Sequence, residues 1–285
     1  MTALLSPALD ANATVPLELA LAAEDFTRVQ QLIRERAGIH LQDGKQAMVH
    51  SRLARRVRET GHAGFGSYLR WLTQASGPDA DAEWQRFVNC LTTNLTSFFR
   101  EEHHFTALAD DLRQRRGRPL RIWCNAASTG EEPYSLAMTV LETLGTGAPV
   151  RILATDIDTQ VLATAEAGVY AADARGLDAA RLRQHFLRGK GAHEGRIRVK
   201  RDVAGLIRFD SFNLMREHWA LGEPFDIVFC RNVMIYFDAA TQRRVLQRIH
   251  GVMAPDGLLY VGHSENFTDA RQWFRLRGKT IYERV

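Results

Sequence analysis

The first third of the chain has the spacing of apolar residues that is typical of amphipathic helices. In its first helical segment the apolar residues recur three and four positions apart: Phe26, Val29, Leu32 and Ile33. Asp25 precedes them as a candidate N-cap. The same pattern predicts further helices over residues 44–59, 65–72 and 82–91. We therefore predict an N-terminal helical domain over residues 21–91, preceded by a flexible leader of residues 1–20.

After residue 118 short apolar runs alternate with helical segments. Five of these runs are predicted to be buried strands: 120–124, 150–154, 207–209, 225–230 and 257–261. Helices are expected over 133–144, 159–166 and 239–253, and an edge strand over 280–283. Because strands that alternate with helices form parallel sheets covered on both faces, we predict an α/β domain over residues 92–285.

One charged stretch interrupts this alternation. Ile197 and Val199 are flanked there by Arg196 and Arg198. Alternation with a period of two is typical of a strand with one exposed face. The pattern predicts a small antiparallel β subdomain, inserted at about residues 175–205.

Composition excludes several classes of protein. Of the 285 residues 45% are hydrophobic and 25% are charged, as in folded globular domains. The sequence has neither an apolar run of about 18 residues nor a basic segment before its N-terminal apolar patch, so we expect a cytoplasmic protein without membrane insertion. Cys90, Cys124 and Cys230 form no CxxC pair, which predicts buried thiols and no metal cluster. A net charge of +4 does not by itself indicate a nucleic-acid partner.

The first predicted strand ends in a turn of small residues, within WCNAASTGEEPYSLAM at 123–138. Ligands of open α/β sheets bind at the carboxyl ends of the strands. The turn lacks both GxGxxG and the P-loop lysine, which argues against dinucleotides and nucleoside triphosphates. Glu131 and Glu132 open the next helix and would repel a phosphate. They bind a cationic ligand or complement the helix dipole, and the residues alone favour neither interpretation.

Polar residues also follow two other predicted strands. Asp156, in ATDID, stands where nucleotide-binding α/β folds place an acid on ribose hydroxyls. Asp158 is interpreted as a helix N-cap. Arg231 and Asn232 directly follow the apolar strand at 225–230. Their position at a strand end favours a role in ligand binding over that of a solvated cap.

The segment TNLTSFFR, residues 93–100, joins the two predicted domains. Its polar residues and its two aromatic residues are compatible with a capped linker helix that buries Phe98 and Phe99. Arg100 ends this segment and would lie near the ligand crevice.

Five segments together resemble the CheR family of chemotaxis receptor methyltransferases: TNLTSFFR, STGEEPYSLAM, ATDID, FCRNVMIYFD and GLLYVGHSEN. They occur in the family's order and cover about residues 25–285. The resemblance implies a class I S-adenosylmethionine-dependent methyltransferase with a Rossmann-like sheet, an N-terminal all-α domain and a small antiparallel β subdomain. It also implies O-methylation of glutamate side chains on membrane chemoreceptors in chemotaxis adaptation, with S-adenosylhomocysteine as the product.

The resemblance carries over a set of site residues. The implied cofactor contacts are Asn94, Thr96, Arg100, Glu131, Asp156, Asn213, Leu214, Arg231 and Asn232. Tyr236 would lie close to the transferred methyl group. A glutamate carboxylate, with a pKa near about 4.3, is already the nucleophile at neutral pH, so no catalytic base is needed. Arg100 is our candidate for orienting this carboxylate, and Tyr236 for a hydrogen bond beside it.

Two surfaces are candidates for receptor binding. The basic residues of the second predicted helix form a docking stripe or a merely solvated face: Lys45, Arg52, Arg55 and Arg56. The loop RGKGAHEG and its flank would tether a receptor's C-terminal peptide by strand addition, or form a flexible hairpin turn. Its residues in question are Arg188, Gly189, Gly191, Gly195 and Arg198.

Other classes of protein fit the sequence less well. Methyltransferases that act on base amines commonly carry a proline in the acceptor motif after the fourth strand, where this chain reads RNVMIYF. A receptor-binding adaptor with a decayed site would not be expected to keep Glu131, Asp156 and Arg231. No nucleic-acid partner is therefore expected.

Overall fold

The computed structural model describes residues 19–265, 267 and 270–285. Most of the predicted leader, residues 1–18, lies outside the described residues. The N-terminal domain contains α1 (Ala23–Ala37), α2 (Gln46–Glu59), α3 (Phe65–Gln74) and α4 (Pro78–Leu91). Their apolar faces meet in one core, in which Val49, Leu53 and Val57 of α2 are fully buried.

Two helix starts differ from the prediction. Helix α1 begins at Ala23 with Ala22 as its N-cap, so Asp25 lies inside the first turn and the predicted cap is wrong. An acid in the first turn still complements the helix dipole. Helix α4 begins at Pro78, a residue that favours the first helical position because its missing N–H needs no partner there.

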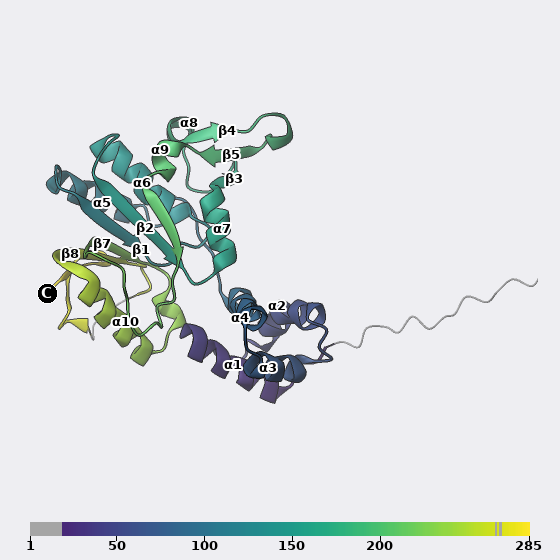
Figure 1. The fold of residues 1–285 in the computed structure, drawn as a ribbon. Helices are drawn as coiled ribbons and strands as arrows, with labels where there is room; N and C mark the ends of the chain where they lie inside the picture. The colour runs from purple at the N-terminus through teal and green to yellow at the C-terminus, as the bar shows by residue number, and fades with distance from the viewer. Residues whose placement is uncertain (1–18, 266, 268–269) are drawn as a thin grey trace, which may run out of the picture.

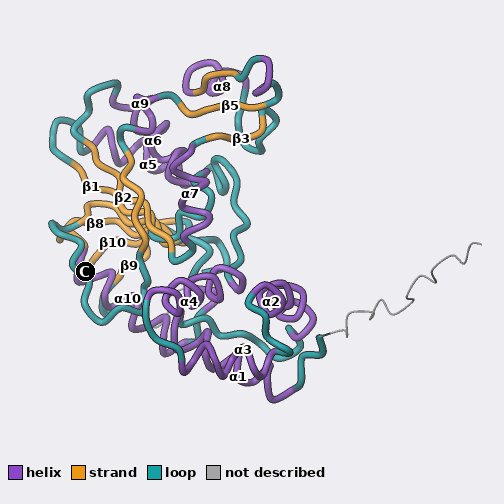
Figure 2. Tube along the Cα trace, turned by 45° about the vertical axis from the view of Figure 1, so that its right-hand side comes forward, coloured by secondary structure: helices purple, strands orange, loops and turns teal. Residues whose placement is uncertain are grey.

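The α/β domain has a seven-stranded sheet of order β6-β2-β1-β7-β8-β10-β9. Its strands are β1 (Leu120–Cys124), β2 (Val150–Asp156), β6 (Ile207–Ser211), β7 (Phe225–Cys230), β8 (Met253–Val261), β9 (Phe274–Gly278) and β10 (Ile281–Arg284). The first five strands of this order pair in parallel, as the alternation of strands and helices predicts. Figure 2 shows the twisted sheet, with its strands in orange, running through the middle of this domain.

Helices cover both faces of the sheet (Figure 1). Helices α5 (His103–Gln114), α6 (Glu131–Leu144) and α7 (Thr159–Ala167) share a core with Ile122 and Cys124 of β1. Helix α10 (Ala239–Val252) packs on the other face, in a core that contains Trp123. Successive side chains of a strand point to opposite faces, so β1 contributes to both cores.

The predicted edge strand at 280–283 is not at the edge. Strand β10 pairs antiparallel with β8 on one side and with β9 on the other, so β9 forms the edge. Sequence patterning misses β9 because Phe274 is its only buried residue. The sheet is therefore mostly, and not wholly, parallel.

A second, three-stranded antiparallel sheet has the order β3-β5-β4. It contains β3 (Val169–Ala171), β4 (Phe186–Arg188) and β5 (Arg196–Val199), with α8 (Ala179–His185) and α9 (Arg201–Ala204) beside them. The alternation predicted for β5 is confirmed, since Ile197 and Val199 are buried. The sheet begins at β3, before residue 175, so the subdomain extends beyond the predicted range. Figure 1 shows it projecting from one end of the α/β domain.

The N-terminal domain packs against the carboxyl edge of the large sheet. Ile39 forms an isolated bridge with Phe237, and the His40 N–H donates to the Tyr236 carbonyl at 2.7 Å. The Asn213 amide donates to the Arg36 carbonyl at 2.6 Å. Within the described ranges, no helix has both the length and the apolar character that a membrane crossing requires.

Candidate active site

A pocket lies where β1, β2, β6 and β7 end, closed on one side by the N-terminal domain. With one exception, the residues implied for cofactor binding and catalysis line it: Asn94, Thr96, Arg100, Asp156, Asn213, Leu214, Arg231, Asn232 and Tyr236. They come from the ends of β2, β6 and β7 and from the segment that joins the domains. The structure thus brings together residues that are up to about half the chain apart in sequence, and their individual roles stay predictions.

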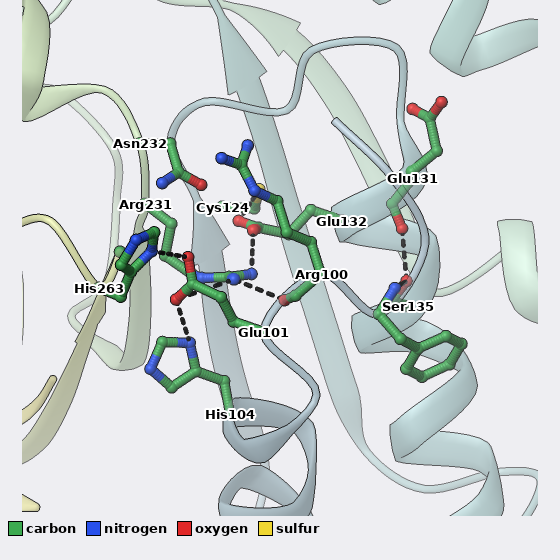
Figure 3. Close-up of polar contacts among 12 residues, drawn as sticks. Arg100, Glu101, His104, Cys124, Glu131, Glu132, Ser135, Arg231, Asn232 and His263 are labelled. Carbon is green, nitrogen blue, oxygen red and sulfur yellow. Dashed lines mark hydrogen bonds and ion pairs between the residues drawn. The ribbon is translucent and has the colours of Figure 1, made fainter. Parts of the chain in front are cut away.

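Glu131 is the exception, since it is not among the residues that line the pocket. Its carboxylate accepts a hydrogen bond from the Thr129 hydroxyl at 2.6 Å. In Figure 3 its side chain points away from Arg231, whereas the side chain of Glu132 points toward Arg231. Glu132 lines the pocket instead. Of the two acids that open α6, the second therefore faces the site.

Arg231 is at the centre of a buried ionic cluster (Figure 3). Its guanidinium contacts Glu132 Oε2 at 2.5 Å and Glu101 Oε2 at 3.4 Å, and it donates to the Arg100 carbonyl at 2.5 Å. Burial raises the pKa of Glu101, but Arg231, His263 and His104 outweigh this effect and hold the pKa below its ordinary value. Because its side chain has no exposed surface, Arg231 is not a solvated cap.

Asp156 ends β2 and is 8% exposed. Its carboxylate accepts hydrogen bonds from the backbone N–H groups of Ser128 at 2.8 Å and Asp158 at 3.0 Å. Burial outweighs the lowering effect of these bonds and raises the pKa of Asp156 to about 6. Asp156 is therefore an acid held in fixed orientation at the pocket wall, as a partner of ribose hydroxyls requires.

Asp158 is confirmed as the N-cap of α7, since its Oδ1 accepts from the N–H groups of Gln160 and Val161. Its Oδ2 accepts from Asn94 Nδ2 at 2.8 Å and from the Thr92 hydroxyl at 2.7 Å. The cap thereby also fixes the segment that carries Asn94 into the pocket.

The segment at 93–100 is an irregular loop rather than a linker helix. Phe98 and Phe99 are buried as predicted. The Ser128 hydroxyl donates to the Asn94 carbonyl at 3.0 Å, and Arg100 Nη1 donates to the Leu95 carbonyl at 2.9 Å. In Figure 3 the Arg100 guanidinium extends toward Asn232, away from the Arg231 cluster.

Glu265 is a site residue that sequence reasoning missed. It is 3% exposed, and its carboxylate accepts from the backbone N–H groups of Asn232, Val233, Met234 and Gly262 at 2.7 to 3.0 Å. These bonds hold the turn between β7 and Tyr236, where Asn232 has a φ of 58°. The segment GLLYVGHSEN contains Glu265, but no spacing in the sequence connects it with residue 232.

Asn125 was missed as well. It lines the pocket, is 3% exposed, and its amide has no oxygen or nitrogen partner within the described part of the chain. Its side chain does bond the Cys230 thiol, a weak partner. Buried amides normally find oxygen or nitrogen partners, so this amide keeps capacity for a ligand's polar groups.

The basic stripe of α2 is partly neutralised. Arg56 pairs with both Glu83 and Glu59, and Arg55 pairs with Glu59 at 2.6 Å. Arg52 donates to the Thr92 carbonyl at 2.6 Å. Lys45, just before α2, is exposed. The stripe therefore carries less free positive charge than its sequence indicates.

The glycine-bearing loop forms an ordered hairpin between β4 and β5. The Gly189 N–H donates to the Arg196 carbonyl at 2.8 Å. A Cβ at Gly189 would lie 2.0 Å from the His193 carbonyl oxygen, which only glycine avoids. Arg188, Gly189 and Arg198 line a shallow pocket on this sheet, whereas Gly191 and Gly195 occupy the turn beyond it.

Ligand atoms of Glu101, His103 and His104 lie within 4.8 Å of one another. Burial and then Arg231 lower the pKa of His104 to about 3, so its ring is neutral. The Arg231 guanidinium already neutralises Glu101, which disfavours a metal ion there. The three cysteines are free, and Cys90 is only partly buried, contrary to the prediction.

A ligand pocket at the carboxyl edge of a doubly covered sheet, with an acid after the second strand, fits a nucleoside-containing cofactor, and the match to a SAM-binding methyltransferase domain makes the protein an S-adenosylmethionine-dependent methyltransferase. Residues 94–282 match the family model described as CheR methyltransferase, SAM binding domain, and residues 24–92 match that of the CheR all-alpha domain. The chain therefore belongs to the CheR family of chemotaxis methyltransferases, and S-adenosylmethionine is its cofactor.

Curated relatives cover most of this chain. It is 51% identical over 269 residues to the chemotaxis protein methyltransferase of Escherichia coli, covering 93% of this chain and 92% of the relative. It is 49% identical to that of Salmonella typhimurium, covering 93% and 91%. It is 45% identical to chemotaxis protein methyltransferase 2 of Pseudomonas aeruginosa, covering 93% and 94%.

Proposed function

We propose that this protein methylates glutamate side chains of membrane chemoreceptors in the cytoplasm, as part of chemotaxis adaptation. The observation that carries the proposal is the contrast between two arginines of one pocket. Arg231 is neutralised by Glu132 and Glu101. Arg100 contacts no carboxylate among the described residues, although it lines the same pocket. An uncompensated cation in this position suits a ligand that brings its own carboxylate, as both the acceptor glutamate and the amino-acid end of the cofactor do.

The pocket also suits the cofactor. Bound S-adenosylmethionine supplies a methyl group on a positively charged sulfonium and leaves as S-adenosylhomocysteine when a carboxylate oxygen takes that methyl. Asp156 would accept hydrogen bonds from ribose hydroxyls, and the amides of Asn125 and Asn232 would bind the polar groups of the amino-acid end. Asn94 would contribute its Oδ1, because its Nδ2 already donates to Asp158 and Thr92. Asn213 and Leu214 would flank the base. Glu131 does not line the pocket, so under this proposal it would act on the cofactor only indirectly.

The protein's part in the reaction is mainly positioning. A glutamate is ionised at neutral pH, so none of the pocket residues has to remove a proton. Arg100 orients the incoming carboxylate, and the Tyr236 hydroxyl donates a hydrogen bond beside it. Holding two reactants in the right geometry contributes up to about 7–11 kcal/mol in well-oriented cases. The buried Arg231 cluster keeps the turn around Arg100 in place, since Arg231 donates to the Arg100 carbonyl.

Two surfaces would bring the receptor to this pocket. The basic residues on and before α2 would face the acidic methylation helices of the receptor. The antiparallel subdomain has two edge strands, β3 and β4, and the pocket beside Arg188 and Arg198 would hold side chains of an added peptide strand. Such a tether would raise the local substrate concentration without altering the chemistry.

The decisive experiment is incubation of the protein with a labelled methyl donor and chemoreceptor membranes. We expect base-labile label on receptor glutamates, because methyl esters hydrolyse in base. Membranes whose receptor carries alanine at the methylated positions are the control and should stay unlabelled. Base-stable label, or label in a nucleic-acid fraction, would contradict the proposal.

A further inference from the structure

The small antiparallel subdomain contacts two loops of the cofactor pocket. One is the loop 93–100, which carries Asn94, Thr96 and Arg100, and the other is the turn after β1, which carries Ser128. The Ser128 hydroxyl joins the two loops, because it donates to the Asn94 carbonyl at 3.0 Å. Neither loop is part of a helix or strand, so its conformation depends on the elements that pack against it.

Tyr170 of β3 holds the turn after β1. Its hydroxyl donates to the Thr129 carbonyl at 2.7 Å, and a Cβ at Gly130 would lie 2.6 Å from the same hydroxyl oxygen. Gly130 also has a φ of 100°, a conformation that favours glycine. Ser128, next to Thr129, donates its backbone N–H to Asp156 at 2.8 Å. A shift of this turn would therefore disturb a bond that fixes the proposed ribose partner.

The segment between β3 and α8 holds the loop 93–100. The Phe98 N–H donates to the Arg175 carbonyl at 3.2 Å. Gly176 lies so close that a Cβ there would be 1.9 Å from the Phe98 carbonyl oxygen, and its φ is 92°. Any other residue at position 176 would therefore displace Phe98, which stands two positions before Arg100.

The subdomain also contacts the aromatic side chains of this loop. The Phe98 ring meets Tyr170 edge-on with 4.9 Å between the ring centres, and it meets Phe186 of β4 at 5.7 Å. The guanidinium of Arg181, on α8, lies 3.6 Å from the centre of the Phe99 ring. Edge-to-face rings and a cation over a ring face are both favourable arrangements. The loop is thus held through its side chains as well as through its backbone.

We propose that the antiparallel subdomain positions the cofactor pocket, with Tyr170 and Gly176 as its positioning residues. Neither residue lines the pocket, and both act through the loops that do. The subdomain thereby serves methyl transfer itself, in addition to any peptide that its edge strands bind. Its effect on cofactor affinity does not depend on which acceptor is methylated, whereas its effect on turnover rests on the proposed function.

The first test is Tyr170→Phe, which removes one hydroxyl and keeps the ring against Phe98. We expect the Kd for S-adenosylmethionine, measured by calorimetry, to rise about threefold to tenfold, the range of one neutral hydrogen bond. The matched control is Tyr134→Phe, because the Tyr134 hydroxyl also donates to a backbone carbonyl at 2.7 Å, that of Ala165 in α7. Tyr134→Phe should lower the melting temperature about as much as Tyr170→Phe does, but leave the Kd unchanged.

The second test is Gly176→Ala, which forces the Phe98 carbonyl away. We expect kcat for receptor methylation to fall about tenfold to a hundredfold, since a displacement of about 1 Å near the reactants has this effect. The Phe98 amide should also exchange its hydrogen faster with solvent, because its bond to Arg175 is weakened. The control is Gly191→Ala in the same subdomain, where φ is 58° but a Cβ meets nothing within 4 Å. It should leave kcat and the exchange rate unchanged.

Two results would overturn the inference. One is a wild-type Kd in Tyr170→Phe protein together with wild-type amide exchange in Gly176→Ala protein. The other is an equal rise of the Kd in Tyr170→Phe and Tyr134→Phe proteins, which would reflect a general loss of stability. If the wild-type protein labels no receptor but Tyr170→Phe alone weakens cofactor binding, the proposed function fails while the positioning role stands.

Discussion

At the scale of single residues, charge compensation distinguishes the two arginines of the pocket. Arg231 holds Glu132 and Glu101, and its removal would leave buried carboxylates unpaired. Arg100 gives only one hydrogen bond, to the Leu95 carbonyl, among the described residues. Its charge is therefore free for a ligand, and its substitution tests catalysis without the loss of a buried ion pair.

We expect Arg100→Met to lower kcat for receptor methylation about tenfold to a hundredfold, the range in which a charge-assisted hydrogen bond to the acceptor falls. The Kd for S-adenosylmethionine should change less, because Arg100 is assigned to the carboxylate. Stopped-time methylation assays and calorimetry measure the two effects. Arg100→Lys, which keeps the charge but not the fork of donors, should recover part of the loss. Unchanged turnover in Arg100→Met protein would remove the assigned role.

If Asp156 binds the cofactor as proposed, cofactor binding should depend on pH. Its pKa is raised to about 6 by burial, so the carboxyl of the free protein becomes protonated below that pH. A raised carboxyl pKa stabilises the fold at low pH, and this contribution is lost as pH rises from about 4 to about 6. The affinity for the cofactor would change with pH in the opposite direction, because ribose hydroxyls would donate to the ionised Asp156 carboxylate. Below about pH 6, we expect the Kd for S-adenosylmethionine to rise about tenfold for each unit by which the pH falls.

Calorimetry between pH 5 and pH 8 checks this prediction. Asp156→Asn protein should bind more weakly at neutral pH and show a flat profile through the same window. A wild-type Kd that is constant down to pH 5 would mean that Asp156 does not bind the cofactor in its ionised form.

At the scale of elements, the glycine hairpin of the β subdomain can be tested with alanine. A Cβ at Gly189 would lie 2.0 Å from a backbone oxygen of His193, so Gly189→Ala must displace the hairpin. At Gly191 a Cβ meets nothing within 4 Å, although φ is 58°, so Gly191→Ala costs only about 1 kcal/mol. If β4 or β5 helps to hold a receptor peptide, Gly189→Ala should weaken peptide binding far more than Gly191→Ala.

The measurement is titration of a receptor C-terminal peptide against the wild type and the two variants. Calorimetry with S-adenosylmethionine serves as the control, since the hairpin is separate from the cofactor pocket and that affinity should stay constant. Peptide binding that is equal in all three proteins would contradict the tether.

The helices and strands also show which parts of the fold can be predicted from sequence patterns. The parallel strands and most helices follow from apolar periodicity, because burial on one or both faces imposes it. Strand β9 has a single buried residue and β3 has none, so neither leaves a pattern to detect. For the site, strand ends predict Asp156, Arg231 and Asn232. Glu265 could not be predicted, because it acts on the turn after β7 through backbone bonds that form only once β8 lies beside β7.

At the scale of the whole molecule, the N-terminal domain is part of the active site. Ile39 and His40 contact the chain at Tyr236 and Phe237, and Arg52 of α2 donates to Thr92, where the pocket loop begins. A receptor docked on α2 would therefore be held in fixed relation to Arg100. Under the proposed function, this arrangement would connect long-range charge attraction at one surface with the chemistry at another.

Charge reversal on α2 separates attraction from catalysis. The side chain of Arg55 is 83% exposed and pairs with Glu59, so Arg55→Glu changes the surface charge with little effect on the fold. We expect the KM for receptor to rise about threefold to tenfold at low salt, with kcat unchanged, and the difference to shrink at high salt. Arg275→Glu is the matched control, because Arg275 on β9 is 73% exposed and also pairs with a single glutamate, Glu283. Equal effects of the two reversals would show attraction by net charge alone, and an unchanged KM in Arg55→Glu protein would exclude Arg55 from the docking surface.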